Sequence, residues 1–224
     1  MMSNNNSKFI VMIGVLIILF VITAVPILNA QDYPPGFDIS IEWEHFEEQS
    51  KNGQEMDSTQ LGAKINYSMP KTFDVFIALS REELDAGLGG NDVNVDPALA
   101  FRIGGKLYAL RAIPIGVPAD LAISFSYSTA KHEEDKTERD YTHRRIIATG
   151  DLEWRYVRST PYLRLGVLSS ELDTPREDFQ KDYDQTSLLI AAGLYAPIVE
   201  NIFFRAEVNM CQEIGYAVGV QYRF

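Results

Sequence analysis

Most of the chain after Pro35 alternates between apolar and polar residues with a period of two. Between Phe37 and Trp43 the odd positions are apolar or aromatic, whereas the even positions are Asp, Ser and Glu. Successive side chains of a β-strand point to opposite faces, so this pattern predicts strands with one apolar and one polar face. Comparable segments recur along the chain at 37–43, 61–67, 73–80, 99–104, 121–128, 146–156, 163–167, 188–195, 202–208 and 214–224.

These segments predict an all-β protein of about ten strands, within a range of about eight to twelve. Helical periodicity of useful length is missing after residue 30. The strand number stays open, because 104–120 and 186–197 fit more than one division into strands. An even number of antiparallel strands is typical of a bacterial transmembrane β-barrel with up-and-down topology.

The connections between these segments alternate in length. Short ones lie near 69–71, 114–120, 158–161 and 197–201. Long, mainly acidic ones lie near 47–57, 81–96, 131–143 and 169–185, and a short connection at 210–213 is the exception on that side. Up-and-down outer-membrane barrels have short turns at the periplasmic end and longer loops outside the cell. The alternation therefore predicts this topology.

Aromatic residues gather near the two ends of the predicted strands, as expected for belts at the two membrane–water interfaces. Those near the short-turn end are Tyr67, Phe73, Tyr156, Tyr162, Tyr195, Phe203, Phe204, Tyr222 and Phe224. Those near the other end are Trp43, Phe46 and Tyr127. The alternative is a soluble barrel or sandwich with aromatic ends. The charged face of most strands speaks against an apolar soluble core, and the placement of the long loops speaks against a sandwich.

The first 30 residues differ from the rest of the chain. Lys8 is followed by an apolar run from Phe9 to Leu28, and Asn29-Ala30 leads into a polar segment. This order predicts a signal peptide over 1–30, cleaved after Ala30, with the barrel domain over 31–224. The run is also long enough to span a bilayer as a retained helix. A periplasmic β-protein tethered by that helix is the corresponding alternative.

The charge of the predicted mature chain limits its partners. Lys8 is the one charged residue before Gln31, so 31 acidic residues face 19 Lys and Arg, a net charge of −12. A basic footprint for nucleic acid is therefore absent. Cys211 is the one cysteine in the sequence, which excludes an internal disulfide. We expect it to be an incidental thiol at a hairpin tip.

The last predicted strand resembles the assembly signal of bacterial outer-membrane proteins. Apolar or aromatic residues recur at every second position from Ile214 to Phe224, and the residues of this row nearest its end are Tyr216, Val218, Val220, Tyr222 and Phe224. The resemblance implies recognition by the barrel-assembly machinery and surroundings of outer-membrane lipid and lipopolysaccharide. As architecture, residues 31–224 resemble small barrels of the OmpA/OmpX and porin-like type.

With the apolar faces outward, the polar faces put charges of both signs into the lumen. The main candidates are Glu42, Lys64, Asp74, Arg102, Asp151, Glu153, Arg155, Arg164, Arg205 and Glu207. About ten strands lies close to the size at which side chains fill the lumen. We therefore expect an internal network of ion pairs in a protein with a structural, adhesive or surface-interaction role. A narrow porin-like channel for small solutes is the alternative.

Catalysis is the least favoured reading. His132 follows Ser126 and Ser128, which would fit a serine–histidine pair, and His143 lies close to Asp140 in sequence. Both histidines are expected in a charged loop, and His45 is expected at an interface or rim. No catalytic residue is predicted, although an outer-membrane lipid or peptide hydrolase stays open.

Metal binding has only a weak signal. The segment Gly87–Asp96 carries oxygen ligands at alternating positions, as a calcium site requires, but it lacks the order of an EF-hand loop. We expect no cofactor and no specific metal site. Divalent cations bridging the acidic loops to lipopolysaccharide phosphates are a hypothesis.

Overall fold

The computed structural model describes residues 35–49, 55–69, 72–88, 91–115, 117–134, 139–156, 159–173 and 183–224. The predicted signal peptide and its cleavage after Ala30 lie outside these residues. Among the residues described, no helix has the length and hydrophobicity needed to cross a membrane.

The described chain forms eleven strands. They are β1 (Gly36–Gln49), β2 (Glu55–Met69), β3 (Phe73–Leu88), β4 (Asn91–Asn94), β5 (Ala98–Ile115), β6 (Val117–Glu134), β7 (Arg139–Trp154), β8 (Thr160–Asp173), β9 (Tyr183–Val199), β10 (Ile202–Met210) and β11 (Ile214–Arg223). Ten of them pair in chain order, β3 with β5 included, and all pairings are antiparallel. The short β4 pairs with the end of β3.

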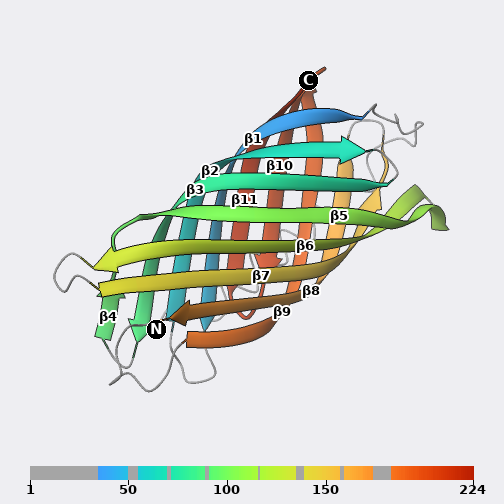
Figure 1. The fold of residues 1–224 in the computed structure, drawn as a ribbon. Coiled ribbons are helices and arrows are strands. Elements are labelled where there is room, and N and C mark those ends of the chain that lie inside the picture. The colour runs from blue at the N-terminus through green and yellow to red at the C-terminus, as the bar shows by residue number, and fades with distance from the viewer. Residues whose placement is uncertain are drawn as a thin grey trace.

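The sheet closes between β1 and β11. Ile41 lies opposite Val220, and His45 lies opposite Tyr216, while β2 pairs with both β1 and β3. Every barrel strand therefore has two neighbours, which removes the exposed sheet edges that invite aggregation. Figure 1 shows the resulting tilted barrel. The prediction of a closed, all-β, up-and-down barrel of about ten strands is confirmed, with ten strands in the barrel.

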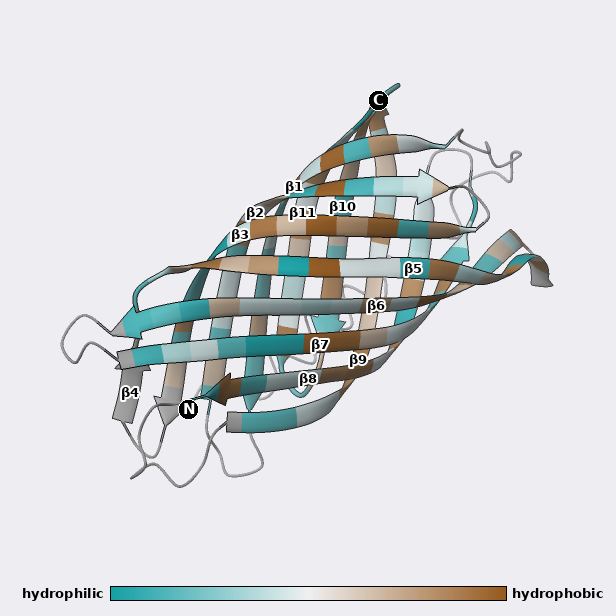
Figure 2. Cartoon of the chain, viewed as in Figure 1, coloured by the Kyte–Doolittle hydropathy of each residue, from teal (hydrophilic) through white to brown (hydrophobic). Residues whose placement is uncertain are grey.

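The outward side of the barrel is apolar and exposed. On β3 the outward residues Val75, Ile77 and Leu79 are half exposed, and beyond them Arg81 and Glu83 continue the same face. We call the exposed outward apolar side chains the apolar band. It includes Ile41, Ile77, Ile103, Ile123, Leu165 and Val220. Hydrophobic residues run along the middle of the strands, whereas the long-loop ends of β6 and β7 are mostly hydrophilic (Figure 2).

The strands continue well past the apolar band into the segments predicted as long loops. The β1–β2 ladder runs to Gln49 opposite Glu55, and the β6–β7 ladder runs to Glu134 opposite Arg139. The predicted long loops over 47–57 and 131–143 are therefore largely wrong. Beyond the band the outward residues are charged and the inward ones mix polar with apolar side chains, so the lipid-facing apolar row that marks a strand disappears while the backbone hydrogen bonds go on. The acidic residues of 174–182 lie outside the described part of the chain.

Five of the twelve aromatic residues predicted for the belts point inward instead. Tyr67, Phe73, Phe204, Tyr222 and Phe224 lie on the outer face near the short-turn end, as predicted, and Trp43 and Tyr127 lie on the outer face near the other end. The residues that occupy inward positions are Phe46, Tyr156, Tyr162, Tyr195 and Phe203, and all of them except Tyr195 are buried. The distance of a residue from a turn in the sequence gives its height along the barrel. Whether it lies at an odd or an even position of the strand decides which face it points to.

Candidate functional site

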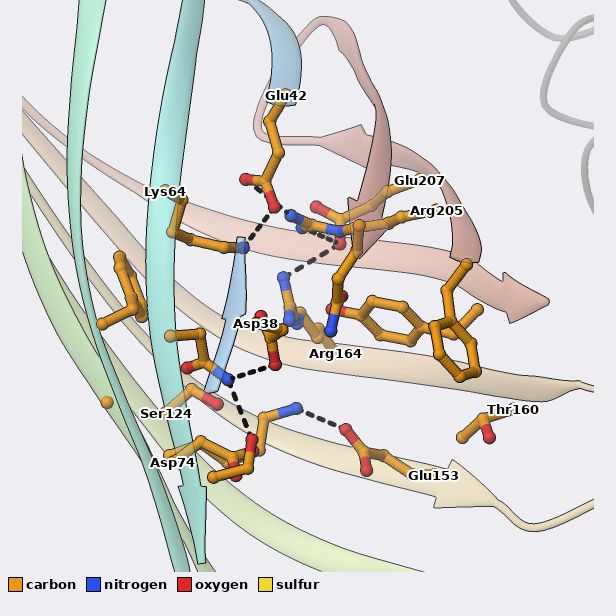
Figure 3. Close-up of a pocket in the computed structure, with 18 of the residues that line it drawn as sticks. Asp38, Glu42, Lys64, Asp74, Ser124, Glu153, Thr160, Arg164, Arg205 and Glu207 are labelled. Atoms are coloured by element: carbon orange, nitrogen blue, oxygen red, sulfur yellow. Dashed lines mark hydrogen bonds and ion pairs between the residues drawn. The ribbon is translucent and has the colours of Figure 1, made fainter. Parts of the chain in front are cut away.

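The short-turn half of the lumen contains a cavity of about 350 Å³. It extends from Thr160 and Pro197 at the short-turn end to Phe46 and Ile147 at mid-height. Its wall is made of side chains from all ten barrel strands, and many of these are charged (Figure 3). This cavity and its wall are the candidate functional site.

The structure gathers the ten lumen residues suggested by the sequence into this site. Nine of them line the cavity: Glu42, Lys64, Asp74, Arg102, Glu153, Arg155, Arg164, Arg205 and Glu207. Asp151 is fully buried behind the wall, where Lys106 and Arg164 hold it. Because charges leave water only when they are paired and hydrogen-bonded, the arrangement of these pairs decides what the lumen can do.

Glu207 is the centre of one group of ion pairs in the cavity wall. Its Oε2 accepts hydrogen bonds from the Tyr162 hydroxyl at 2.6 Å, from Arg164 at 2.9 Å and from Arg205 at 3.0 Å. Arg205 also reaches across the lumen to Glu42 at 3.2 Å, which Lys64 binds from β2. These contacts tie β1, β2, β8 and β10 together through the lumen (Figure 3).

A second group of charges occupies the opposite wall. Asp151 accepts hydrogen bonds from Ser124 at 2.5 Å and from Thr149 at 2.6 Å. Lys106 on β5 lies 3.2 Å from Asp151 and also pairs with Glu153. Arg164 lies 3.4 Å from Asp151, so it connects this group to Glu207. The network is therefore continuous around the barrel.

The mouth of the cavity holds Asp120 and Arg111, which the sequence did not single out. Asp120 accepts from the Arg111 side chain at 3.2 Å and from the backbone N–H of Ala112 at 3.1 Å, and Arg155 also binds it. Ala112 has a positive φ of 52° within an irregular stretch of the β5–β6 ladder. The irregularity brings Arg111 back toward Asp120, and alternation alone gives no signal for such a bend.

The inward aromatic residues fix the arginines in place. The Arg111 guanidinium lies 4.1 Å from the Tyr108 ring centre, and that of Arg164 lies 5.0 Å from Tyr162. Further pairs of this kind are Arg205 with Tyr195 and Arg223 with Phe203. Cation–π contacts of this geometry are attractive and also orient the planar guanidinium. The wall is therefore a fixed array of charges.

Two apolar clusters lie in the long-loop half of the lumen, beside buried polar residues such as Glu48, Glu82 and Arg145. Phe46, Leu168, Leu189 and Cys211 form one buried cluster, with Ile147 packed against it. A second cluster lies among the strand ends and consists of Met56, Leu84, Ala86, Val95, Tyr141 and Leu172. We call these two clusters the outer plug. Cys211 is fully buried in it, so the expected incidental thiol at a hairpin tip points into the lumen. Burial raises the pKa of this thiol to about 12.

A buried polar cluster accompanies the outer plug. Glu82 accepts from Ser58 and Gln60, both at 2.7 Å, and the rings of His132 and His143 lie 3.2 Å and 3.0 Å from its carboxylate. All five side chains are buried. The expectation that His132 and His143 belong to a charged loop is wrong, because β6 and β7 continue past them and both rings point inward.

Alternation in the sequence gives no signal for this Glu82 cluster, because the cluster lies at the strand ends, where the outward residues are no longer apolar. Ser80, Glu82, Leu84 and Ala86 keep the inward parity of β3, but charged residues occupy the outward positions between them. Burial raises the pKa of Glu82, but the charge of His143, the hydrogen bonds from both histidines and the charge of Arg145 outweigh it. Together they hold this pKa well below its usual range.

His45 has a different environment. It lies on the outward face of β1, where its ring stands 5.1 Å from the Tyr216 ring and its nitrogens contact Thr59 and Glu47. Trp43 packs on the same tyrosine at 4.9 Å. This position, at the long-loop border of the apolar band, agrees with the interface expected for His45.

Metal ligation has no support in the described residues. No group of three or more His, Cys, Asp or Glu among them is arranged to hold a metal ion. In the segment Gly87–Asp96, residues 89 and 90 lie outside the described residues, and 91–94 form β4. Divalent cations at the acidic loops stay a hypothesis.

Comparisons with known proteins give a likeness of fold. No protein-family model matches the chain, and no curated protein sequence matches it. Ail, the attachment invasion locus protein of Yersinia pestis, solved with the heparin analogue sucrose octasulfate, has a TM-score of 0.44 and 14% identity over 86% of this chain and 100% of that one. Neisserial surface protein A has a TM-score of 0.40 and 15% identity over 88% and 100%.

A third similar structure is the translocator domain of the autotransporter NalP from Neisseria meningitidis, with a TM-score of 0.48 and 11% identity over 99% of this chain and 98% of that one. Ail is an outer membrane protein, so outer-membrane barrels are among the structures that this chain resembles. With identities of 15% or less and TM-scores below 0.5, the activities of these proteins are not carried over to it.

Proposed function

We propose that this chain is an outer-membrane β-barrel with a closed lumen and a non-catalytic role at the bacterial surface. The observation that carries the proposal is the inverted distribution of polarity. The outward side chains of the ten strands form the exposed apolar band, whereas the inward ones include at least ten paired charges. Soluble monomers rarely expose contiguous apolar patches of more than a few hundred Å². A lipid-facing barrel requires this distribution.

The orientation follows from the two ends of the barrel. The short-turn end has brief connections, such as Glu200–Asn201, and faces the periplasm in barrels of this type. At the other end the strands project beyond the apolar band, and their outward residues are charged. The surface that an external partner meets is therefore made by these projecting strand ends and the connections between them. A structural, adhesive or surface-interaction role fits this surface.

The narrow porin-like channel is the second candidate. The cavity of about 350 Å³ with its charged wall supports this candidate. The outer plug speaks against it, because Phe46, Leu168 and Leu189 pack together across the lumen above the cavity. An aqueous path would have to pass these packed apolar side chains and the buried, paired Glu48 and Arg145 beside them. We therefore favour the closed barrel.

The hydrolase is the third candidate. Both His132 and His143 lie within hydrogen-bond reach of a carboxylate, Glu82. However, the nearby Ser58 donates to Glu82 instead of to a histidine, and all of these groups are buried. A nucleophile needs an adjacent base and access to its substrate. We propose that the cluster is structural.

Several partners belong to the same proposal. The outward row Tyr216, Val218, Val220 and Tyr222 on β11 is exposed and suits recognition by the barrel-assembly machinery. Lipid and lipopolysaccharide would surround the band. Export through the signal peptide and cation binding at the acidic loops also stay proposals.

Conductance in planar lipid bilayers tests the proposal. The refolded full chain should insert, show heat-modifiable mobility on gels and give no regular open state. A stable unitary conductance would overturn the closed-lumen proposal in favour of the channel. Absence from the outer-membrane fraction, together with unaltered gel mobility, would overturn the membrane assignment itself.

A further inference from the structure

One carboxylate in the cavity wall forms no ion pair in the described part of the chain. Asp74, at the start of β3, accepts a hydrogen bond from the Tyr108 hydroxyl at 3.0 Å and interacts with the Ser68 hydroxyl. Each of the other carboxylates that line the cavity lies within ion-pair distance of a lysine or an arginine. They are Asp38, Glu42, Glu44, Asp120, Glu153 and Glu207.

The lysine opposite Asp74 is engaged elsewhere. Lys106 on β5 is the register partner of Asp74, but its ammonium group pairs with Asp151 and Glu153 instead. Asp74 is half-buried and lines the cavity, so a molecule in the cavity can reach its carboxylate (Figure 3). A carboxylate that has lost part of its hydration is stabilised by pairing with a cation. The ammonium group of a ligand would provide this cation.

Arg111, at the same mouth, has donors that the described residues do not use. Its Nη1 donates to Asp120 at 3.2 Å, and this carboxylate also accepts from Arg155. A guanidinium group has five N–H donors and no acceptor. Within the described ranges Nη2 of Arg111 has no hydrogen-bond partner, and the side chain, which lines the cavity, is 24% exposed. A carboxylate of a ligand would accept a hydrogen bond from this nitrogen.

Tyr108 holds these two groups beside each other. Its hydroxyl donates to Asp74, and its ring lies against the Arg111 guanidinium, which is 4.1 Å from the ring centre. The pairing of β3 with β5 fixes the first contact, and the irregular stretch of β5 around Ala112 accompanies the second. An acceptor and a donor of opposite charge therefore lie on the two sides of one phenol, and all three side chains line the cavity.

We propose that the mouth of the cavity binds a small zwitterion of the free amino acid class, whose ammonium group pairs with Asp74 and whose carboxylate accepts from Arg111. The volume of about 350 Å³ lies at the lower end of the range for ligand sites, so the ligand is small. A ligand with one charge would satisfy Asp74 or Arg111 and leave the other group as it is. In the orientation proposed above, this mouth faces the periplasm.

NMR of the refolded full chain in detergent micelles tests the ligand class. The protein carries carbon-13 tyrosine, and the spectrum of Tyr108→Phe assigns the Tyr108 ring. L-Alanine should shift this signal saturably, whereas propionate, which lacks the ammonium group, and ethylamine, which lacks the carboxylate, should bind more weakly. No saturable shift with L-alanine, or equal affinity for either of the other two compounds, would overturn the proposal. The comparison uses the wild-type chain and holds for either orientation of the barrel in a membrane.

Two variants test the contacts. Asp74→Asn and Arg111→Gln should each weaken L-alanine binding by about tenfold or more, as expected for one hydrogen bond to a charged group. Arg81→Gln, which changes an exposed outward arginine paired with Glu83, is the control and should bind as the wild type does. Heat-modifiable mobility on gels shows that each variant has folded. Unchanged affinity in folded Asp74→Asn and Arg111→Gln would show that L-alanine binds elsewhere.

Discussion

The ring of Tyr162 on β8 covers Gly193, its register partner on β9. A Cβ atom added at Gly193 would lie 2.3 Å from the Tyr162 ring and 2.8 Å from the Ala206 carbonyl oxygen. The missing side chain therefore makes the space in which Tyr162 donates to Glu207. One glycine thus supports the centre of the lumen network.

Gly193→Ala should destabilise the barrel by about 1–3 kcal/mol, because a methyl group is forced into a filled site. The matched control is Gly150→Ala, since a Cβ there would meet only the Leu165 carbonyl oxygen, at 3.8 Å. Urea unfolding in phospholipid vesicles measures both changes. Equal stabilities for the two variants would mean that Tyr162 can leave its place at no cost.

The apolar band predicts a position-dependent cost for a charge on the outer face. Ile77→Lys should cost about 2–4 kcal/mol in vesicles if this part of β3 faces lipid. Glu83→Lys, three outward positions further along the same strand, should change stability by less than about 0.5 kcal/mol. Both positions are exposed, at 50% for Ile77 and 63% for the Glu83 side chain, so a water-facing strand would tolerate both.

Glu207 pairs with Arg164 and Arg205, and removal of its charge leaves Arg164 with Asp151 alone and Arg205 with the carboxylates of β1. Glu207→Gln should destabilise by about 3–5 kcal/mol, because breaking a buried ion pair exposes the cost of the remaining charge. Glu200→Gln, at an exposed turn, should have no measurable effect. A small effect at Glu207 in equilibrium unfolding would indicate that water fills the cavity and screens the arginines.

The lowered pKa of Glu82 predicts a loss of stability in acid. A carboxyl whose pKa is lower in the folded state contributes stability above its unfolded value of about 4.3, and this contribution disappears as the pH falls through the lower folded value. Below about pH 4 the wild type should therefore lose stability more steeply than Glu82→Gln. The control is Glu83→Gln, an exposed outward neighbour, which should retain the wild-type slope in thermal melts at pH 5 and below.

Cys211 should not react while the barrel is folded. Its thiol is fully buried and its pKa is raised to about 12, and the thiolate is the reactive form. A maleimide should label it at pH 7.5 only after unfolding. In the double variant Cys211→Ser and Glu213→Cys, the exposed thiol two residues further on should react at once. Rapid labelling of folded wild-type protein would place Cys211 outside the plug.

Alternation alone was enough for the fold within the apolar band. The contrast between Ile39 or Ile41 and Ser40 or Glu42 marks a strand with a lipid side and a lumen side, and ten such segments predict a barrel. The same parity places Glu42, Arg205 and Glu207 in the lumen. Where the outward face becomes charged the contrast is lost, so alternation predicts loops around Glu82, His132 and His143, where the structure has strand ends.

The sequence by itself thus determined the strand pattern within the apolar band, a strand number of about ten, and the lumen side for charges such as Glu42, Arg205 and Glu207, because these follow from a period of two along one strand. Only the tertiary structure decided which charges meet. Glu82 contacts His132 and His143 across 50 and 61 residues of chain, and Arg205 contacts Glu42 across 163. Such pairs depend on the register between strands and on the curvature that closes the sheet, and both arise from all ten strands together.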